Sequence, residues 1–293
     1  MPAVIETHEL TKYYGKNRGI INLNLSVSEG EIFGFIGPNG SGKSTTIRTL
    51  LGLINKTSGK AEIFGRDITE KNREILPMIG YMPSEAMFYG SMRVGELIRY
   101  SADLRGMDCA AEAKTLCERL QVEVKKKIEE LSLGNRKKVG IVCALQHRPP
   151  LYFLDEPTSG LDPLMQKEFF SILEERNREG ATVFLSSHVL SEVQEHCGRA
   201  AIIREGKIIA CDYVSLLVKT TAKFVTLAGI TEAPSIPGIF DLHVANNSVS
   251  FLYKGEINGL LSSLCALPLT DLTITEPGLE DVFLHYYEAE ESK

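Results

Sequence analysis

The sequence has 293 residues, of which 43% are hydrophobic and 24% are charged, and its formal net charge is −6. These values are typical of a globular protein with one large domain or a large and a small one, and they exclude wholesale disorder. No apolar run is long enough to cross a bilayer, and the first ten residues lack the features of a signal peptide, so we expect a cytoplasmic protein. The acidic excess lies in residues 221–293, and no part looks basic enough to bind nucleic acid. The six cysteines contain no C-x-x-C pair, which argues against a disulfide or zinc framework.

The first thirty residues predict strands, broken at Gly15 and Gly19 and closed by Glu29-Gly30. Tyr13 and Tyr14 lie just before the glycine-rich segment described next. An aromatic ring at this place could stack on a purine base. A strand aromatic that packs in a sheet explains the two tyrosines equally well.

The segment EIFGFIGPNGSGKST, residues 31–45, contains the main motif. Its apolar residues predict a strand buried on both faces, and TTIRTLLGL after it predicts a helix. Between them stands G-x-x-x-x-G-K-[ST], whose glycines allow backbone N–H groups to surround a phosphate at a helix N-terminus. In this motif the lysine reaches the β- and γ-phosphates and the serine holds Mg²⁺. The sequence therefore predicts a nucleoside triphosphate site formed by Gly37, Pro38, Asn39, Gly40, Ser41, Gly42, Lys43, Ser44 and Thr45.

The next hundred residues change from strands to helices. SGKAEIFGRDIT predicts a turn and a strand, and MIGYMPSEAMFYGSM predicts a strand that enters a loop at Pro83. Residues 93–147 are mainly helical by their apolar spacing, with an interruption at Leu133-Gly134 and a helix that resumes until Pro149. The lysine-rich runs at 125–127 and 136–138 are typical of solvated helix faces.

A second apolar strand, Leu151 to Leu154, ends in Asp155 and Glu156. Ligands of open α/β sheets bind at the carboxyl ends of such strands. Asp155 would hold Mg²⁺, and Glu156 would activate water. The alternative is that these acids cap the helix that starts near Pro163. A third buried strand, ATVFLSSH, brings His188 to the same edge, where it is placed to contact the γ-phosphate.

The hairpin AAIIREGKIIACD closes a first domain, residues 1–215. Residues 221–293 predict a separate accessory α+β domain, joined to the first by a linker around Val214 to Thr221. Its predicted strands are KFVTLAGI, DLHVANNSVSFLYKG with a turn at Asn246-Asn247, and LTDLTITEP. Its predicted helices are INGLLSSLCAL and GLEDVFLHYYEAE.

Residues 1–215 resemble the nucleotide-binding subunit of an ABC transporter. GPNGSGKST resembles the phosphate loop of that family and LYFLDEP its Mg²⁺ strand, with Glu156 as the catalytic glutamate. LSLGN at 131–135 resembles the signature LSGGQ, which in the family contacts the ATP held by the other subunit of a dimer. The remaining matches are Ser132 and Gly134 at key signature positions, Ser159 and Asp162 in the D-loop SGLD, His188 as the switch histidine and Tyr14 as the base-stacking aromatic.

This resemblance implies an α/β P-loop NTPase of the ABC ATPase fold, with a RecA-like core, an antiparallel β subdomain and a helical signature subdomain. Leu133 and Asn135 depart from the signature. Ser84 stands where the family usually has a glutamine that contacts Mg²⁺, and Glu85 follows it. The Mg²⁺ contact would therefore come from Ser84, from Glu85, or through water.

The terminal PGLEDVFLHYY is similar to the C-terminal extension of ATPases in the ABC-2 exporter group. The resemblance implies an ATPase that uses ATP and Mg²⁺, with Lys43, Glu156 and His188 as catalytic residues. It implies a homodimer, or a heterodimer with a similar ATPase, on a separately encoded polytopic permease at the inner face of the membrane, without insertion into it. The cargo would be a drug, antibiotic peptide, ion or lipid-like molecule.

Two alternative functions remain open. The first is an ATPase that regulates a membrane sensor or permease without transport. The second is a soluble ABC ATPase acting on ribosomes or DNA.

Overall fold

The computed structural model describes residues 2–85, 87–218, 223–232, 234–245, 247–265 and 267–275. Contacts divide the chain into two compact units, Met1–Cys211 and Asp212–Lys293. The predicted helix GLEDVFLHYYEAE lies outside the described residues. The predicted bounds of the two domains, 1–215 and 221–293, therefore stay a prediction.

The first unit begins with a four-stranded antiparallel sheet in the order β2-β1-β4-β5. A tight turn at Gly15 joins the first two strands into a hairpin, whereas Gly19 lies inside the second strand and does not break it. Apolar side chains that alternate along both strands bury one face of this sheet. Its strands are β1 (Ala3–Tyr14), β2 (Asn17–Ser28), β4 (Ser58–Ile63) and β5 (Arg66–Asp67).

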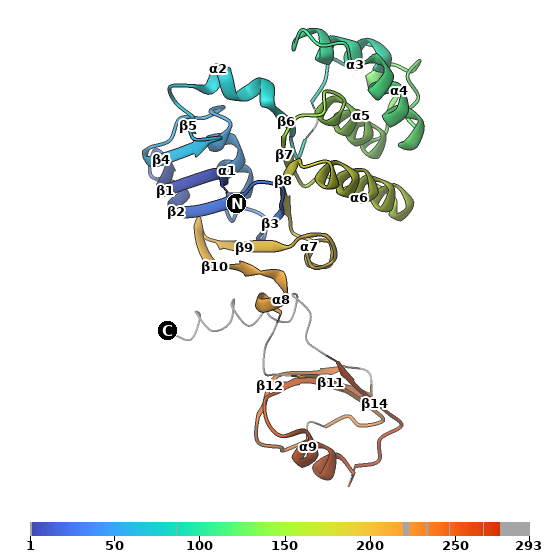
Figure 1. The fold of residues 1–293 in the computed structure, drawn as a ribbon. Coiled ribbons are helices and arrows are strands. Elements are labelled where there is room, and N and C mark those ends of the chain that lie inside the picture. Colours follow the sequence, from blue (N-terminus) through green and yellow to red (C-terminus); the bar gives the residue numbers. More distant parts are fainter. Residues whose placement is uncertain are drawn as a thin grey trace. The chain divides into compact units, whose positions relative to one another are not determined.

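A six-stranded sheet in the order β10-β9-β3-β8-β7-β6 forms the centre of the first unit, and its ladder from β9 to β6 is parallel (Figure 1). Ile36 pairs with Ser187, and Asp155 pairs with Ser186. The strands β3, β8 and β7 therefore end level with one another, and the segments that follow them meet at one edge. The strands are β3 (Ile32–Ile36), β6 (Ile79–Met82), β7 (Leu151–Asp155), β8 (Thr182–Ser187), β9 (Arg199–Arg204) and β10 (Lys207–Tyr213).

Phenylalanines hold the central strands together. Phe184 of β8 is fully buried, and its ring lies 5.8, 5.2 and 5.3 Å from those of Phe33, Phe35 and Phe153. Such aromatic contacts add to the stabilisation that comes from burying the rings. They fix the sheet whose edge carries the polar residues described below.

Helices surround the central sheet, and α3, α4 and α5 form a group away from the antiparallel sheet (Figure 1). Residues 93–147 are thus mainly helical, as predicted. The helices are α1 (Lys43–Leu50), α2 (Asn72–Ile75), α3 (Val94–Asp103), α4 (Ala110–Arg119), α5 (Leu133–Leu145), α6 (Pro163–Arg178) and α7 (Leu190–His196), with 3₁₀ turns at Leu76–Met78 and Ile128–Glu130.

Helix α5 corrects two sequence predictions. Leu133 and Gly134 do not interrupt it but form its first turn, and Ser132 is its N-cap. Lys137 and Lys138 are 2% and 8% exposed, so they do not form a solvated face. The helix is apolar from Val139 to Leu145, and every residue of that segment except Cys143 is buried, so α5 lies inside the unit and its two lysines are enclosed with it.

The second unit contains an antiparallel sheet in the order β12-β13-β11-β14 and its own core around Val225, Phe251 and Leu260. The supposed linker begins with a helical turn, and residues 219–222 lie outside the described ranges. The elements are α8 (Val214–Leu217), β11 (Lys223–Ala228), β12 (Ile239–Ala245), β13 (Ser248–Tyr253), α9 (Ile257–Leu264) and β14 (Asp271–Thr275).

Two features concern the whole chain. Within the part that the structure describes, no helix is both long enough and apolar enough to cross a membrane. Cys109, Cys117 and Cys197 are buried, Cys143 is half-buried, and Cys211 and Cys265 are exposed.

Candidate functional site

The phosphate loop, residues 37–45, connects β3 to α1. Gly40 and Gly42 have φ of +80° and +114°, a region that residues with a side chain rarely enter. Gly37 is required for a different reason, since a Cβ there would lie 2.4 Å from the carbonyl oxygen of Ile203. Gly42 caps α1 without a side-chain hydrogen bond. The backbone N–H groups of the first turn are therefore available to an anion.

Lys43 has a buried side chain, 5% exposed, at the start of α1. Its ammonium donates to the carbonyl oxygens of Gly37 at 2.6 Å and Pro38 at 3.3 Å. It also lies 3.1 Å from Glu156 Oε1. The ammonium thus stands between the loop and the residue that follows β7, and each of these contacts is one that a phosphate could replace.

Asp155 is fully buried at the end of β7. Its Oδ1 accepts a hydrogen bond of 2.6 Å from Ser186 Oγ, whereas its Oδ2 is buried without a hydrogen-bond partner. Buried carboxylate oxygens are normally paired. An unpaired one at this edge is suited to a ligand that the chain itself does not supply.

Glu156 has an unusual backbone conformation, and its carboxylate lies between Lys43 and His188. Its φ is +51°, in the left-handed region. The N–H of Glu156 donates to the carbonyl oxygen of Ser186 at 3.1 Å. The carbonyl oxygen of Glu156 accepts a hydrogen bond of 2.7 Å from Lys137 Nζ. Its Oε2 lies 2.5 Å from His188 Nδ1, whose side chain is 49% exposed. A carboxylate between an ammonium and an imidazole can accept a proton from water beside a bound phosphate.

The capping alternative for the two acids is wrong. The residue that caps α6 is Asp162, whose Oδ1 accepts from the N–H of Met165 at 3.0 Å. Asp155 and Glu156 instead make the contacts described above.

The start of α5 packs against the D-loop, residues 159–162. A Cβ on Gly134 would lie 2.4 Å from the carbonyl oxygen of Gly160, so the two backbones are in direct contact. Ser132 and Ser159 are exposed, and Ser132 Oγ accepts from the N–H of Asn135 at 3.3 Å. The exposed serine at a helix N-terminus could bind an anion from another molecule.

Tyr14 lies at the end of β1 and is 45% exposed, with the Lys12 ammonium 5.1 Å from its ring centre. An added Cβ on Gly19 would lie 3.2 Å from the Tyr14 ring and 3.0 Å from the Thr45 methyl group. The ring is therefore close to the phosphate loop and accessible, rather than packed in the sheet.

Ser84 and Glu85 follow β6, which lies beside β7 in the sheet. Ser84 is half-buried, and Glu85 is exposed. The Glu85 carboxylate acts to raise the pKa of Lys137, as Asp155 and Glu156 do, against the larger lowering effect of burial.

Two residues of this site were missed from the sequence. Ser186 is a fully buried serine near the end of β8, and a buried hydroxyl needs a hydrogen-bond partner. Lys137 was assigned to a solvated face, although the apolar segment after it indicated a buried helix. Both signals were present in the sequence, but only the fold shows that Ser186 contacts Asp155 and that Lys137 contacts Glu156.

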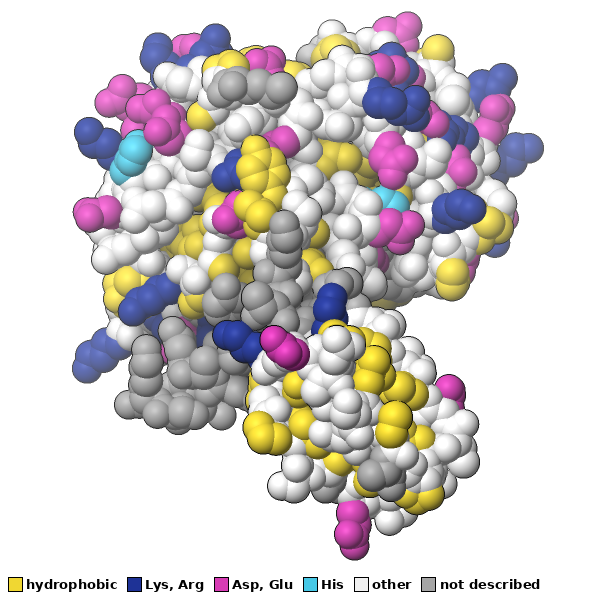
Figure 2. Space-filling model, turned by 60° about the horizontal axis from the view of Figure 1, so that its bottom comes forward, with side chains coloured by type: hydrophobic (Ala, Val, Ile, Leu, Met, Phe, Trp, Pro, Cys, Tyr) yellow, Lys and Arg dark blue, Asp and Glu magenta, His cyan; other side chains and the backbone are white. Residues whose placement is uncertain are grey.

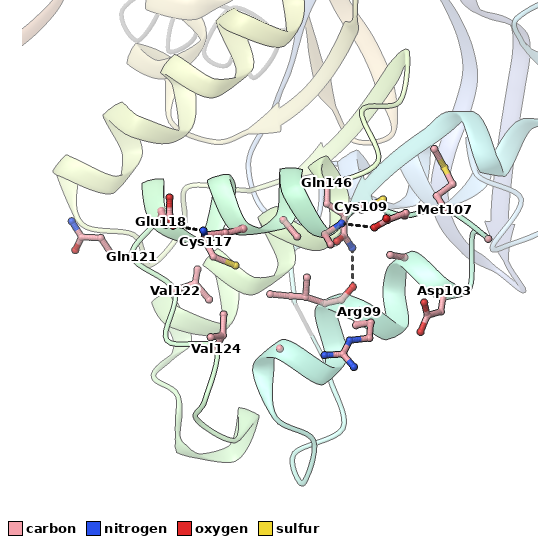
Figure 3. A pocket seen from close by; sticks show the side chains of 18 residues that line it. Arg99, Asp103, Met107, Cys109, Cys117, Glu118, Gln121, Val122, Val124 and Gln146 are labelled. Atoms are coloured by element: carbon pink, nitrogen blue, oxygen red, sulfur yellow. Dashed lines mark hydrogen bonds and ion pairs between the residues drawn. The ribbon is translucent and has the colours of Figure 1, made fainter.

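A cavity of about 1100 Å³ lies elsewhere, among α3, α4 and the end of α5 (Figure 3). Its walls include Ile98, Cys117, Val122 and Gln146. None of the site residues above lines it.

On the face seen in Figure 2, acidic and basic side chains of the described residues are interspersed.

Comparisons with known proteins agree with this architecture. The ABC transporter family model matches residues 20–159. The chain is 35% identical to the bacitracin transport ATP-binding protein BcrA of Bacillus licheniformis, with 97% of each chain covered. It is 31% identical to the linearmycin resistance ATP-binding protein LnrL of Bacillus subtilis (strain 168), with 96% of this chain and 97% of the other covered.

Among solved structures, the chain resembles an ATP-binding subunit of an ABC transporter with a TM-score of 0.68 at 28% identity, covering 73% of this chain and 91% of the other. An ATP-binding cassette in its ADP conformation matches with a TM-score of 0.62 at 25% identity, covering 73% and 92%. These matches confirm the predicted ABC ATPase fold. The chain therefore belongs to the ABC transporter family, as an ATP-binding subunit with the ATPase activity of that family.

Proposed function

We propose that this chain is the ATPase subunit of an exporter, working as a dimer on a separately encoded membrane permease at the inner face of the membrane. The observation that carries the proposal is the meeting of Lys43, Glu156 and His188 at one sheet edge. Lys43 Nζ lies 3.1 Å from Glu156 Oε1, and His188 Nδ1 lies 2.5 Å from Oε2. This group combines a phosphate-binding cation with a base.

The contacts of Lys43 suggest how binding prepares the reaction. The β- and γ-phosphates of ATP would take the place of the Gly37 and Pro38 carbonyls and of Glu156 around the ammonium. Glu156, released from Lys43, would accept a proton from water as the water oxygen bonds to the γ-phosphorus. The bond from that phosphorus to the bridging oxygen then breaks, which leaves ADP and phosphate. His188 would steady the γ-phosphate.

The residues present fit a magnesium ion. Asp155 Oδ2 is a buried carboxylate oxygen without a partner, and oxygen donors are the ligands that Mg²⁺ prefers. We infer that Ser44 and Asp155 would hold the ion, with Ser84 or Glu85 completing the set. When bound, Mg²⁺ neutralises charge that builds up on the phosphates.

The exposed side of the site supports a dimer in which each chain covers the ATP of the other. Ser132 and Gly134 at the start of α5 would contact the γ-phosphate held by the partner. Ser159 and Asp162 of the adjoining D-loop would line the same interface, and Tyr14 would stack on the base. In the single chain Tyr14, Ser132, Ser159 and Asp162 are exposed, and Gly134 is half-buried.

The first test is Glu156→Gln, which keeps the shape of the side chain and removes the base. We expect ATP binding to persist while kcat falls by about a hundredfold or more, the scale of a lost general base. The variant should accumulate as an ATP-bound dimer in size-exclusion chromatography. Glu118→Gln, an exposed change on α4, is the control. Normal turnover in Glu156→Gln would remove this residue as the base.

The exporter assignment draws on the relatives, whose names concern bacitracin transport and linearmycin resistance. We infer that the cargo is a drug, antibiotic peptide, ion or lipid-like molecule chosen by the permease. Affinity capture of the tagged chain from detergent-solubilised host membranes should yield a polytopic membrane protein in equal ratio. Ribosomal or DNA-bound partners, with nothing from the membrane, would overturn the assignment. Transport by the reconstituted complex separates an exporter from an ATPase that only regulates a membrane sensor.

A further inference from the structure

Lys137 is a buried cation that the reaction described above does not use. Its side chain is 2% exposed on the second turn of α5, and its ammonium donates to the carbonyl oxygen of Glu156 at 2.7 Å. The cost of burying an ammonium is several kcal/mol, and ion pairs in such places add little to stability. A role in the adjoining site explains the residue better than a role in the fold.

The backbone of Glu156, which Lys137 contacts, is in the left-handed region. Glu156 has φ of +51°, which disfavours a residue with a side chain. Strained conformations persist where the surroundings fix them, and they concentrate at functional sites. The N–H of Glu156 is held by Ser186, and its carbonyl group by Lys137. The two bonds together fix the peptide planes on both sides of the base.

Negatively charged groups near Lys137 favour the charged form of its buried side chain. Burial lowers the pKa of Lys137, whereas Asp155, Glu156 and Glu85 act in the opposite direction. The three carboxylates therefore favour the charged form of this buried ammonium. Lys137 also belongs to α5, whose N-cap is Ser132, so the orientation of the base depends on the placement of that helix.

We propose that Lys137 is a positioning residue for Glu156, holding the left-handed backbone that aims the carboxylate at the attacking water. The proposal rests on the proposed role of Glu156 as the base. The lysine acts through the peptide group of Glu156 and does not touch ATP. Its loss should therefore slow hydrolysis and leave nucleotide binding in place.

The test compares Lys137→Gln, which keeps a donor, with Lys137→Met, which keeps the length of the side chain without one. We expect the Kd for ATP and the KM to stay within about twofold of wild type. The kcat should fall about tenfold to a hundredfold in Lys137→Met, the scale of a charged hydrogen bond, and less in Lys137→Gln. Lys138→Met, the next buried lysine of α5, is the matched control. Thermal unfolding establishes that each variant is folded in the assay.

A second measurement separates positioning from a structural effect. In a Glu156→Gln background, Lys137→Met should lower the residual rate little further, because the two changes act through one group. A full additional loss would overturn the proposal, as would a wild-type kcat in Lys137→Met. If Glu156→Gln itself turns over normally, the assignment of the base fails first. If Glu156→Gln is inactive while Lys137→Met is fully active, only the role of Lys137 is wrong.

Discussion

At the scale of single residues, the candidate site joins groups from local motifs to partners from distant segments of the chain. The loop from Gly37 to Thr45 and the acids at 155 and 156 were found because their spacing along the chain is itself the signal. Ser186 and Lys137 contact Asp155 and Glu156 from 31 and 19 residues away. Residues so far apart in the sequence form no recognisable motif, so these two contacts could be found only in the fold.

Gly134 gives a prediction at this scale. We expect Gly134→Ala to lower the free energy of unfolding by about 1–3 kcal/mol, because the new methyl group would meet the Gly160 backbone at 2.4 Å and backbone atoms cannot turn away. Urea unfolding measures the change. Gly198→Ala is the control, since its Cβ would meet no atom within 4 Å and its φ is not left-handed. Equal stability of both variants would contradict the close contact of α5 with the D-loop.

At the scale of elements, the buried parallel strands were the easiest to predict, because continuous apolar runs are their signature. The start of α5 was the hardest. Gly134 has low helix propensity and suggested a break. Ser132 is a favoured N-cap, and its Oγ bond to the N–H of Asn135 starts the helix before the glycine. The capping signal decided where the helix begins, and tertiary packing outweighed the propensity of one residue.

Charged pairs between α4 and α6 are contacts that the amphipathic patterns of the two helices do not predict. Arg119 of α4 bonds to Glu175 through both oxygens, at 2.6 and 2.9 Å, and to Glu168 at 2.5 Å. The pKa of the Glu175 carboxyl is lowered chiefly by its hydrogen bond to Arg119. These pairs are about a third exposed, so their stabilising effect is modest. They fix the orientation of the helices, which the amphipathic pattern of either helix does not define.

At the scale of the molecule, the candidate site lies wholly in the first unit, Met1–Cys211. Parallel strands with level carboxyl ends gather residues 37–45, 155–156 and 188 at one edge, although these segments are far apart in the sequence. The general rule for open α/β sheets predicted that edge. The order of the strands could not be obtained from their sequences alone, because each apolar run would fit any central position.

The stability of the whole molecule should depend on pH through His147, which follows α5 and is 6% exposed. Burial, with a smaller contribution from Arg105, lowers the pKa of His147 to about 4, against the opposing hydrogen bond to the Ile79 carbonyl. An unfolded chain binds this proton near pH 6.5, so the stability due to a neutral His147 is complete above that pH. It falls as the pH drops towards 4, by about 3 kcal/mol in total.

His147→Gln tests this dependence, because glutamine can donate to the Ile79 carbonyl but does not titrate in this range. We expect the free energy of unfolding of wild type to fall more steeply than that of the variant between pH 6.5 and 4, and the two curves to run parallel above pH 7. Urea unfolding followed by circular dichroism at half-unit steps measures both. His8→Gln, which replaces an exposed histidine of β1, should follow the wild-type curve. If His147→Gln also follows it throughout, the buried histidine does not control acid stability, and the cause must lie with the carboxylates.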